Sequence, residues 1–334
     1  MDILTKIKEA GLVGRGGASF PTWRKWAMVK DALGEKKYVV CNASEGEPGV
    51  KKDKYILENY PEQVIDGIQR AMEFLLAERA FIYLNPDYFK ELKPKLEKFI
   101  GNAKYIELFK KPHGSGYIGG EETGCINTIE GERTEPRLRP PFPTTNGLWG
   151  YPTLINNVET FYNVSIVVAG KYKKNRFYTI DGDCLWEGVY ELPENYTIER
   201  ILKETRNYPD FSFFVQAGGA ASGEILNSDG LKKPASGVGS IRIYSLEKHN
   251  PKDLILNWLN FFQRQSCGQC TTCREGTYRL VEEIKKNKLD WELINDLLAN
   301  LEDSSFCALG YSAPIAVSSF LKNALPLISK NRIV

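Results

Sequence analysis

The chain has 334 residues, of which 42% are hydrophobic and 26% are charged, with a formal net charge of +2. This length allows two or three domains with their own cores, and a balanced charge gives no electrostatic case for nucleic acid or a membrane surface as a partner. The amino terminus lacks the apolar core of a signal peptide, and no apolar run approaches the roughly 20 residues of a membrane span. An odd number of cysteines, seven, fits a reducing compartment. We therefore expect a cytoplasmic, multidomain protein without direct membrane insertion.

The first distinctive stretch is a glycine-rich loop, Gly14–Gly17, which follows a segment with helical spacing over residues 3–10. Glycines let a backbone approach a ligand closely and turn its N–H groups toward phosphate, and Arg15 and Lys25 could neutralise the charge. The loop fails the Rossmann fingerprint because Ser19 stands where glycine is wanted and no clear strand precedes it. On its own, the loop is equally typical of a plain turn.

Strands and helices then alternate. We expect strands over 38–41, 80–84 and 105–109, and helices over 64–77 and 88–100. This alternation predicts a parallel sheet. The polar loop 42–49 follows the first strand, at the edge where open α/β sheets bind ligands.

A second polar cluster, Gly119-Gly120-Glu121-Glu122, has two possible roles. Its acids favour the start of a helix electrostatically, or they hydrogen-bond to ribose or nicotinamide groups. The proline-rich segment 137–143 is too stiff for a helix, so we expect a loop there. A helix is expected from 156 to 168.

The rest of the chain contains first a group of short expected strands and then a group of expected helices. Short strands are expected over 177–180, 188–192, 213–219 and 241–244 with a helix over 197–204, and helices follow over 253–263, 277–287, 291–301 and 313–325. The first group predicts a small α+β unit of β-grasp type, and the second predicts an all-α unit. We divide the chain into domains 1–172, 173–247 and 248–334.

Four cysteines have a spacing typical of metal ligands. Cys267, Cys270 and Cys273 are spaced two residues apart, and Cys307 follows after 33 further residues. A tight run of three with one distant cysteine favours an iron–sulfur cluster over zinc, which more often takes two separated Cys-x-x-Cys pairs. A structural zinc site and buried, inert thiols remain the alternatives.

Five sequence blocks together resemble a known family, the flavin-bearing, NADH-oxidising subunit of respiratory complex I and the diaphorase subunits of NAD-linked hydrogenases and formate dehydrogenases. The blocks, in order, are Gly14–Trp26, Cys41–Asp53, Tyr117–Thr123, Pro152–Thr160, and Cys267–Gly276 with Cys307. The resemblance covers nearly the whole chain from Gly11. It implies a multidomain α/β, α+β and all-α fold: a Rossmann-like domain for FMN and NADH, a β-grasp domain and a C-terminal four-helix bundle with one [4Fe-4S] cluster.

The resemblance also implies roles for single residues. It places FMN among Gly14, Arg15, Gly16, Gly17, Lys25, Asn42, Ser44, Glu45, Tyr117, Gly120, Glu121, Asn156 and Asn157. It assigns NADH to Phe20, Glu47, Glu122 and Phe142, and the cluster to Cys267, Cys270, Cys273 and Cys307. No side chain need act as acid or base, although Glu45 and Glu122 lie near the hydride transfer. A carboxylate at Glu47 would repel a 2′-phosphate, which favours NADH over NADPH.

The implied function is electron transfer between NADH and the cluster through FMN, within a larger complex of hydrogenase, formate dehydrogenase or complex I type. The implied partners are a thioredoxin-like [2Fe-2S] subunit and a larger iron–sulfur or catalytic subunit. The alternatives are a flavin-lacking scaffold or ligand-sensing subunit, and a diaphorase that reduces NAD⁺. Ser44 keeps the flavin-lacking alternative open, because the family usually has aspartate there. Ser19 and Met28 also depart from the family pattern, where glycine and an aromatic residue are usual.

Overall fold

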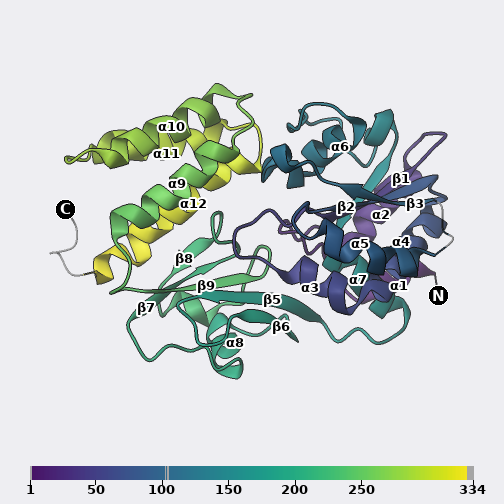
Figure 1. Cartoon of the computed structure of the whole chain (residues 1–334), viewed down its shortest axis with the longest axis horizontal. Coiled ribbons are helices and arrows are strands. Elements are labelled where there is room, and N and C mark those ends of the chain that lie inside the picture. The colour runs from purple at the N-terminus through teal and green to yellow at the C-terminus, as the bar shows by residue number, and fades with distance from the viewer. Residues whose placement is uncertain (1, 102, 104, 329–334) are drawn as a thin grey trace. The chain divides into compact units, whose positions relative to one another are not determined.

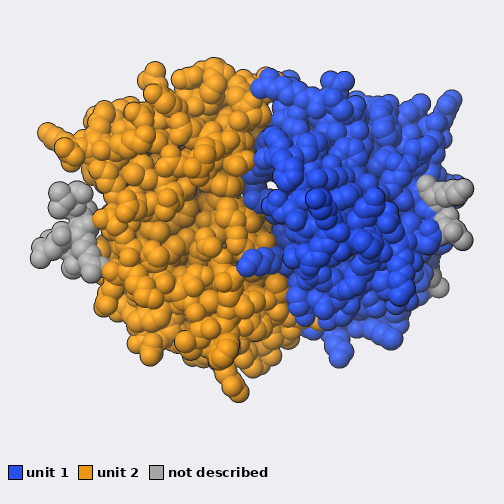
Figure 2. Space-filling view, in the orientation of Figure 1, with its two compact units in different colours: residues 1–46, 51–177 blue, residues 47–50, 178–334 orange. Residues whose placement is uncertain are grey.

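The computed structural model of the chain describes residues 2–101, 103 and 105–328. It divides into two compact units: unit 1 comprises residues 1–46 and 51–177, and unit 2 comprises residues 47–50 and 178–334 (Figure 2). Across the described residues, every helix is too short or too polar to cross a membrane.

Unit 1 is built on a four-stranded sheet in the order β3-β2-β1-β4, and all neighbouring strands run parallel (Figure 1). Its strands are β1 (Tyr38–Ala43), β2 (Arg79–Leu84), β3 (Ile106–Lys110) and β4 (Thr153–Asn157). Its helices are α1 (Ile3–Glu9), α2 (Thr22–Asp31), α3 (Lys52–Asn59), α4 (Pro61–Leu75), α5 (Phe89–Ile100), α6 (Glu122–Glu130) and α7 (Val158–Val168). Short 3-10 helices occupy His113–Ser115, Ile118–Gly120 and Leu148–Gly150.

The two central strands β1 and β2 are buried on both faces, which explains why their sequences are nearly continuous apolar runs. On one face, Val40 and Phe81 pack with Ile126 and Ile129 of α6. Helix α4 packs closely with α7, where a Cβ on Gly67 would lie 2.0 Å from the Phe161 carbonyl oxygen. Only glycine allows that approach.

Unit 2 contains a five-stranded sheet in the order β6-β5-β9-β7-β8, with β5 and β9 parallel and β7 antiparallel to both neighbours. Its strands are β5 (Asn175–Gly182), which begins in unit 1, β6 (Gly188–Pro193), β7 (Phe213–Ala217), β8 (Glu224–Leu226) and β9 (Ser240–Ser245). Its helices are α8 (Ile198–Glu204), α9 (Pro251–Gln265), α10 (Thr271–Lys285), α11 (Trp291–Ser304) and α12 (Ala308–Asn323), with 3-10 helices at Gly230–Lys232 and Leu325–Leu327.

The sheet of unit 2 is covered on two sides. Ile201 of α8 packs in one core cluster with Val215 and Ile243. Phe214, which alternates with Val215 on the strand, contacts Phe320 of α12 at a ring-centroid distance of 5.5 Å. Helix α12 therefore shares a core with the sheet.

The mixed α/β fold, with a parallel sheet and a helical C-terminal part, confirms the coarse fold class predicted from the sequence. Four elements were missed: α2, α3, β4 and β8. Two helices begin at least five residues earlier than expected, α10 at Thr271 rather than 277 and α12 at Ala308 rather than 313. Gly276 and Pro314 lie inside these helices, and such residues ordinarily mark helix ends.

Candidate FMN and iron–sulfur sites

Two predicted asparagine positions meet where β1 and β4 end, at the carboxyl edge of the sheet in unit 1. In the parallel register Asn42 pairs with Asn157. The Asn157 Nδ2 donates to the Asn42 carbonyl oxygen at 3.3 Å, and its Oδ1 accepts from Glu159 N at 3.1 Å, which caps α7. Ligands of open α/β sheets bind at this edge.

The predicted glycine loop lies against the connection from β4 to α7. A Cβ on Gly16 would lie 3.4 Å from Asn157 Cβ, and Arg15 N donates to Thr160 Oγ1 at 2.9 Å. Gly14 N donates to the Phe20 carbonyl oxygen at 2.9 Å. Gly17 has φ +118°, a conformation that favours glycine. The loop backbone therefore passes close to the asparagine edge.

Helix α2 carries Lys25 and Trp26 to the same edge. The Lys25 Nζ donates to the Ile155 carbonyl oxygen at 3.0 Å and forms an ion pair with Glu122. Asn156 is buried, and with its amide oriented to satisfy both polar atoms its oxygen accepts from Trp26 Nε1 at 2.9 Å. Asn156 thus ties β4 to α2, while Asn157 faces the glycine loop.

The Gly120 turn completes the group. The Asn42 Nδ2 donates to the Gly120 carbonyl oxygen at 2.9 Å, and a Cβ on Gly120 would lie 2.9 Å from Ser44 Oγ. A Cβ on Gly46 would lie 3.3 Å from the Tyr117 ring. Both glycines allow backbone segments to approach more closely than a side chain permits.

The two acids after Gly120 have structural partners. Glu121 is the N-cap of α6; its carboxylate accepts from Thr123 N at 2.8 Å and Gly124 N at 3.0 Å and pairs with Arg139. Glu122 lies in the first turn of the same helix. The helix-start role predicted for this pair is therefore present, and contact with ribose or nicotinamide stays a prediction.

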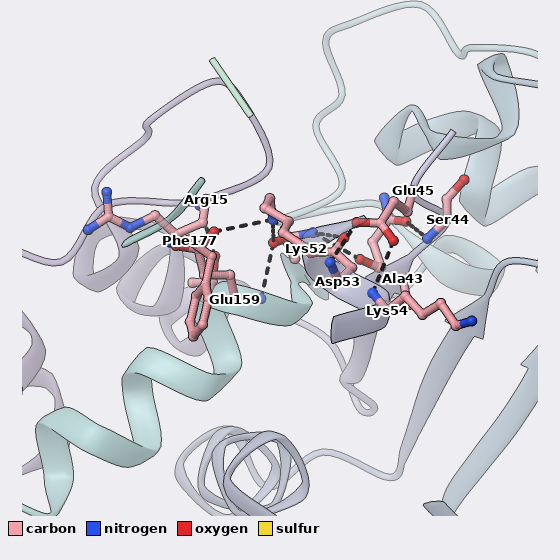
Figure 3. Close-up of polar contacts among 12 residues, drawn as sticks. Arg15, Ala43, Ser44, Glu45, Lys52, Asp53, Lys54, Glu159 and Phe177 are labelled. Atoms are coloured by element: carbon pink, nitrogen blue, oxygen red, sulfur yellow. Dashed lines mark hydrogen bonds and ion pairs between the residues drawn. The ribbon is translucent and has the colours of Figure 1, made fainter. Parts of the chain in front are cut away.

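The buried acid cluster consists of Lys52, Asp53 and Glu159, which are buried, and Glu45, which is partly buried (Figure 3). The cluster lies beside Asn157. The Lys52 Nζ lies 2.7 Å from Asp53 Oδ1, 3.2 Å from Glu159 Oε2 and 2.9 Å from Asn157 Oδ1. Lys52 is only 2% exposed and Glu159 is fully buried. Burial alone would lower the pKa of Lys52, but the Asp53 and Glu159 carboxylates raise it above its usual value.

Glu45 approaches Asp53 from the end of β1. Its carboxylate accepts from Asp53 N at 2.5 Å, from Lys54 N at 3.0 Å and from the Tyr88 hydroxyl at 3.3 Å. Burial, reinforced by the Asp53 charge, raises the pKa of Glu45 to about 8, and burial also raises the pKa of Asp53. Only Glu45 of this cluster was a predicted site residue. The signal available for Lys52 and Asp53 was a pair of opposite charges just after the polar loop 42–49.

Ser44 has an unexpected buried partner, Lys111, which follows β3. The Lys111 Nζ donates to Ser44 Oγ at 2.8 Å, and both residues are nearly fully buried. Burial lowers the pKa of Lys111 to about 8. The position at which the resemblance implies an aspartate thus faces a buried lysine.

The predicted NADH contacts fall into different surroundings. Phe20 is 39% exposed and Phe142 is 49% exposed, so both rings are open to a planar ligand. Glu47 belongs to unit 2 and is buried; its Oε1 accepts from Ala221 N at 2.8 Å and from Ser222 N at 3.1 Å. The Glu47 carboxylate therefore holds the turn after β7 in addition to any role toward substrate.

The four predicted cluster ligands lie at one end of the helices α10 and α12. Cys267 precedes α10, Cys270 is its N-cap, Cys273 lies in its first turn, and Cys307 is the N-cap of α12. Burial first, and then the neighbouring thiols of all three other cysteines, raise the pKa of Cys273 to about 11. Helix N-termini favour thiolates, which iron binds.

Among the described residues, no three His, Cys, Asp or Glu side chains are placed to hold a single metal ion. None of the seven cysteines forms a disulfide.

The residues present fit both groups. Glycine backbone, asparagine amides and lysine ammonium groups at a sheet edge suit a phosphate-bearing cofactor, and Gly16 and Gly120 keep space that a Cβ would fill. Four cysteines that interact electrostatically at two helix N-termini suit an iron–sulfur cluster.

Comparisons with known proteins agree with this assignment. Residues 7–166 match the family model described as Nuo51 FMN-binding domain, and residues 253–327 match the NADH-ubiquinone oxidoreductase-F iron-sulfur binding region. The F subunit of NADH-quinone oxidoreductase of Buchnera aphidicola (subsp. Schizaphis graminum) is 36% identical, and the alignment covers 96% of this chain and 82% of that protein. The Aquifex aeolicus protein of the same name is 32% identical over 92% of this chain and 81% of its own length.

A solved structure gives the same result. A chain of the NAD⁺-reducing [NiFe]-hydrogenase in the H₂-reduced state matches with a TM-score of 0.87 and 29% identity. The match covers 96% of this chain and 60% of the hydrogenase chain. By these matches, the protein belongs to the family of NADH-quinone oxidoreductase F subunits, the FMN- and iron–sulfur-bearing, NADH-oxidising components of larger redox complexes.

Proposed function

We propose that this chain transfers electrons between NADH and a [4Fe-4S] cluster held by Cys267, Cys270, Cys273 and Cys307, by way of FMN at the carboxyl edge of the sheet in unit 1. The observation that carries the proposal is the convergence at that edge of four segments far apart in the sequence. Gly16 lies against Asn157, Lys25 bonds to Ile155, and Asn42 bonds to Gly120.

In this proposal, the chain's own residues bind the cofactor and orient it. Gly14, Gly16 and Gly17 with Arg15 and Lys25 hold the phosphate end, because open backbone and positive charge suit an anion. Asn42, Ser44, Asn156, Asn157, Glu45, Tyr117, Gly120 and Glu121 surround the rest of the cofactor. Bound FMN accepts an electron pair as hydride and gives electrons up one at a time.

For the substrate, we propose that Phe20 and Phe142 stack on its planar rings, with Glu122 and Glu47 facing ribose hydroxyls. The exposure of both phenylalanine rings supports this role. No acid or base is needed for hydride transfer, so the enzyme's work is to hold two planar rings in contact.

We also propose the finer architecture. Residues 1–172 form the Rossmann-like FMN and NADH domain, 173–247 the β-grasp domain and 248–334 the four-helix bundle with the cluster. The parallel pairing of β5 with β9 and the packing of α8 on that sheet support the second domain. Helices α9 to α12 support the third.

As partners we propose a thioredoxin-like [2Fe-2S] subunit and a larger iron–sulfur or catalytic subunit, in a complex at the cytoplasmic face of a membrane or in the cytoplasm. The names of the relatives, which are subunits, support membership of a complex. The seven cysteines without a disulfide are consistent with a reducing compartment.

An anaerobic visible spectrum before and after addition of NADH tests the function. Bleaching of the flavin band, with iron and acid-labile sulfide present, is the expected result. A protein with iron and sulfide but no flavin would overturn the proposal in favour of a scaffold or ligand-sensing subunit.

The cluster assignment makes a separate prediction. Cys270→Ser is expected to remove the cluster's iron and sulfide and stop electron exit while FMN stays bound, because Cys270 lies in unit 2 and the proposed flavin residues lie in unit 1. Cys184→Ser, outside this group, is the matched control. Unchanged iron content in the Cys270 variant would contradict the ligand set.

A further inference from the structure

The buried acid cluster contains more negative than positive groups. Glu45, Asp53 and Glu159 are three carboxyl groups, and Lys52 is the lysine that lies among them. Figure 3 shows the guanidinium of Arg15 directed away from Lys52. Three ionised carboxylates around one ammonium in a buried site would repel one another strongly. One of the carboxyl groups is therefore expected to keep its proton.

The geometry singles out Glu45 as the acid that keeps it, with Asp53 as the acid whose backbone N–H contacts its carboxylate. Glu159 is neutralised by Lys52 at 3.2 Å and accepts from Phe177 N at 3.0 Å. Asp53 shares the same ammonium at 2.7 Å, and Glu45 reaches only backbone N–H groups and the Tyr88 hydroxyl. Glu45 is thus the acid without a cation of its own.

The groups that face this pair come from several parts of the chain. Lys52 and Lys54 N belong to α3, Asn157 ends β4, Glu159 belongs to α7, and Tyr88 precedes α5. The thiol of Cys41 on β1 also interacts electrostatically with Asp53 and Lys52. None of these groups adds a second positive charge to the Glu45 carboxylate, since the Lys54 ammonium pairs with Glu58 and Glu91.

The pair is also next to the proposed cofactor site. Asn157 donates from Nδ2 to Asp53 Oδ2 at 2.6 Å, and its Cβ lies 3.4 Å from the place of a Cβ on Gly16. Glu45 directly follows Ser44, which lies against Gly120. One side chain therefore separates the pair from the glycine loop.

We propose that Glu45 and Asp53 share a single proton in the resting protein, and that this pair accepts the proton that remains at the flavin site when both electrons have left. The second half of this inference rests on the proposed function. The pair is a proton-holding group beside the site, so its role is distinct from the binding roles of Asn42 and Asn157.

The balance of the step is simple. NADH gives up a hydride, which is two electrons and one proton, and NAD⁺ is the product. Once both electrons have passed to the cluster, one proton is left. With FMN bound, the ionised carboxylate of the pair would accept this proton and form an O–H bond, in place of the bond that held the proton at the flavin site. The pair then holds two protons and returns one to water, which reaches Glu45 because that residue is only partly buried.

The shared proton of Glu45 and Asp53 is tested on the FMN-free protein by infrared spectroscopy at neutral pH. The carbonyl stretch of a protonated carboxyl group is expected in the wild type and absent in both Glu45→Gln and Asp53→Asn. Either substitution removes the competing charge, so the remaining acid ionises beside Lys52. Glu73→Gln, an exposed position on α4, is the control that keeps the band. Absence of the band in the wild type, or its survival in both variants, overturns the shared proton.

The transfer of a proton from the flavin site to this pair is tested with FMN bound. The flavin reduction potential plotted against pH is expected to show a break that Glu45→Gln and Asp53→Asn both lose and Glu73→Gln keeps. Identical plots in all four proteins would overturn the coupling. Because the infrared test needs no flavin, failure of the proposed function and failure of this inference are distinguishable. Circular dichroism establishes that the variants are folded, and glutamine keeps an oxygen to accept from Asp53 N.

Discussion

At the scale of single residues, Ser44 and Lys111 form an unusual buried pair. A buried ammonium with a neutral hydroxyl as its partner has a lowered pKa, about 8 against the usual 10.5. Between these pH values the unfolded chain binds more protons than the native protein. The free energy of unfolding therefore rises with pH across that window.

Ser44→Asp is expected to remove this rise of the unfolding free energy with pH. A carboxylate opposite Lys111 raises the lysine pKa again and stabilises the protein near pH 7 by about 1–3 kcal/mol. Denaturant unfolding from pH 7 to 10.5 measures the effect, and Ser44→Ala is the control that adds no charge. If the Ser44→Asp variant kept the slope of the wild type, Lys111 would be neutral for another reason.

Glu47 allows charge and hydrogen bonding to be separated. Glutamine keeps an oxygen for the Ala221 and Ser222 N–H groups, both of which donate to Oε1, while the negative charge is lost. Glu47→Gln is expected to retain stability and to raise turnover with NADPH, because the charge that repels a 2′-phosphate is gone.

Glu47→Ala is the control for the second role of this residue. It leaves the buried Ala221 N–H and the half-buried Ser222 N–H without their acceptor and is expected to cost about 1–3 kcal/mol of unfolding free energy. If NADPH turnover with the glutamine variant stays at the wild-type level, Glu47 does not face the 2′ position.

The sequence identified the predicted residues that converge at the sheet edge because their chemistry is visible in single letters: glycines, asparagines and spaced cysteines. It did not identify Lys52, Glu159 or Lys111. Charged residues are normally solvated, so nothing in the sequence marks the few that become buried. Their partners come from segments up to 107 positions away, as in the pairing of Lys52 with Glu159. Such pairs exist only after folding.

At the scale of elements, helix starts show why sequence patterns fall short. The chain forms helix through Gly276 and Pro314 because packing against neighbouring helices outweighs their low helix propensity. Strand β4 was missed because Asn156 and Asn157 end a strand of only five residues. The neighbouring strand β1 supplies the ladder that stabilises it. Periodicity within one segment carries no information about that neighbour.

Two helix glycines give opposite expectations for the same substitution. Glycine to alanine inside a helix ordinarily stabilises by roughly 0.5–1 kcal/mol. Gly67→Ala is expected to destabilise instead, because the new Cβ would lie 2.0 Å from the backbone oxygen of Phe161. Helices α4 and α7 would have to move apart.

Gly276→Ala is the matched control in α10. Its Cβ would meet the end of the Leu301 side chain at 3.1 Å, which can rotate away. Thermal unfolding of both variants measures the difference. A Gly67 variant as stable as the wild type would mean that the α4–α7 contact is looser than the structure shows.

At the scale of the whole molecule, the two units carry different parts of the chemistry. The asparagine edge and the buried acid cluster lie in unit 1, and the four cysteines lie in unit 2. The family, the overall chemistry and the order of the blocks were predictable from the sequence, since they depend on local motifs. The division at residues 46 to 51 was not, because residues 47–50 belong to unit 2 through contacts such as that of Glu47 with Ala221.

The placement of Cys273 and Cys307 at the starts of α10 and α12 has a consequence for chain entropy. With a cluster bound to both, the 33 intervening residues, which include α11, form a closed loop. By analogy with a disulfide, closing a loop of this length restricts the unfolded chain by about 4 kcal/mol. The metal group would then be a cross-link as well as an electron acceptor. Iron supply would thereby set not only the catalytic competence of the chain but also its lifetime against proteases.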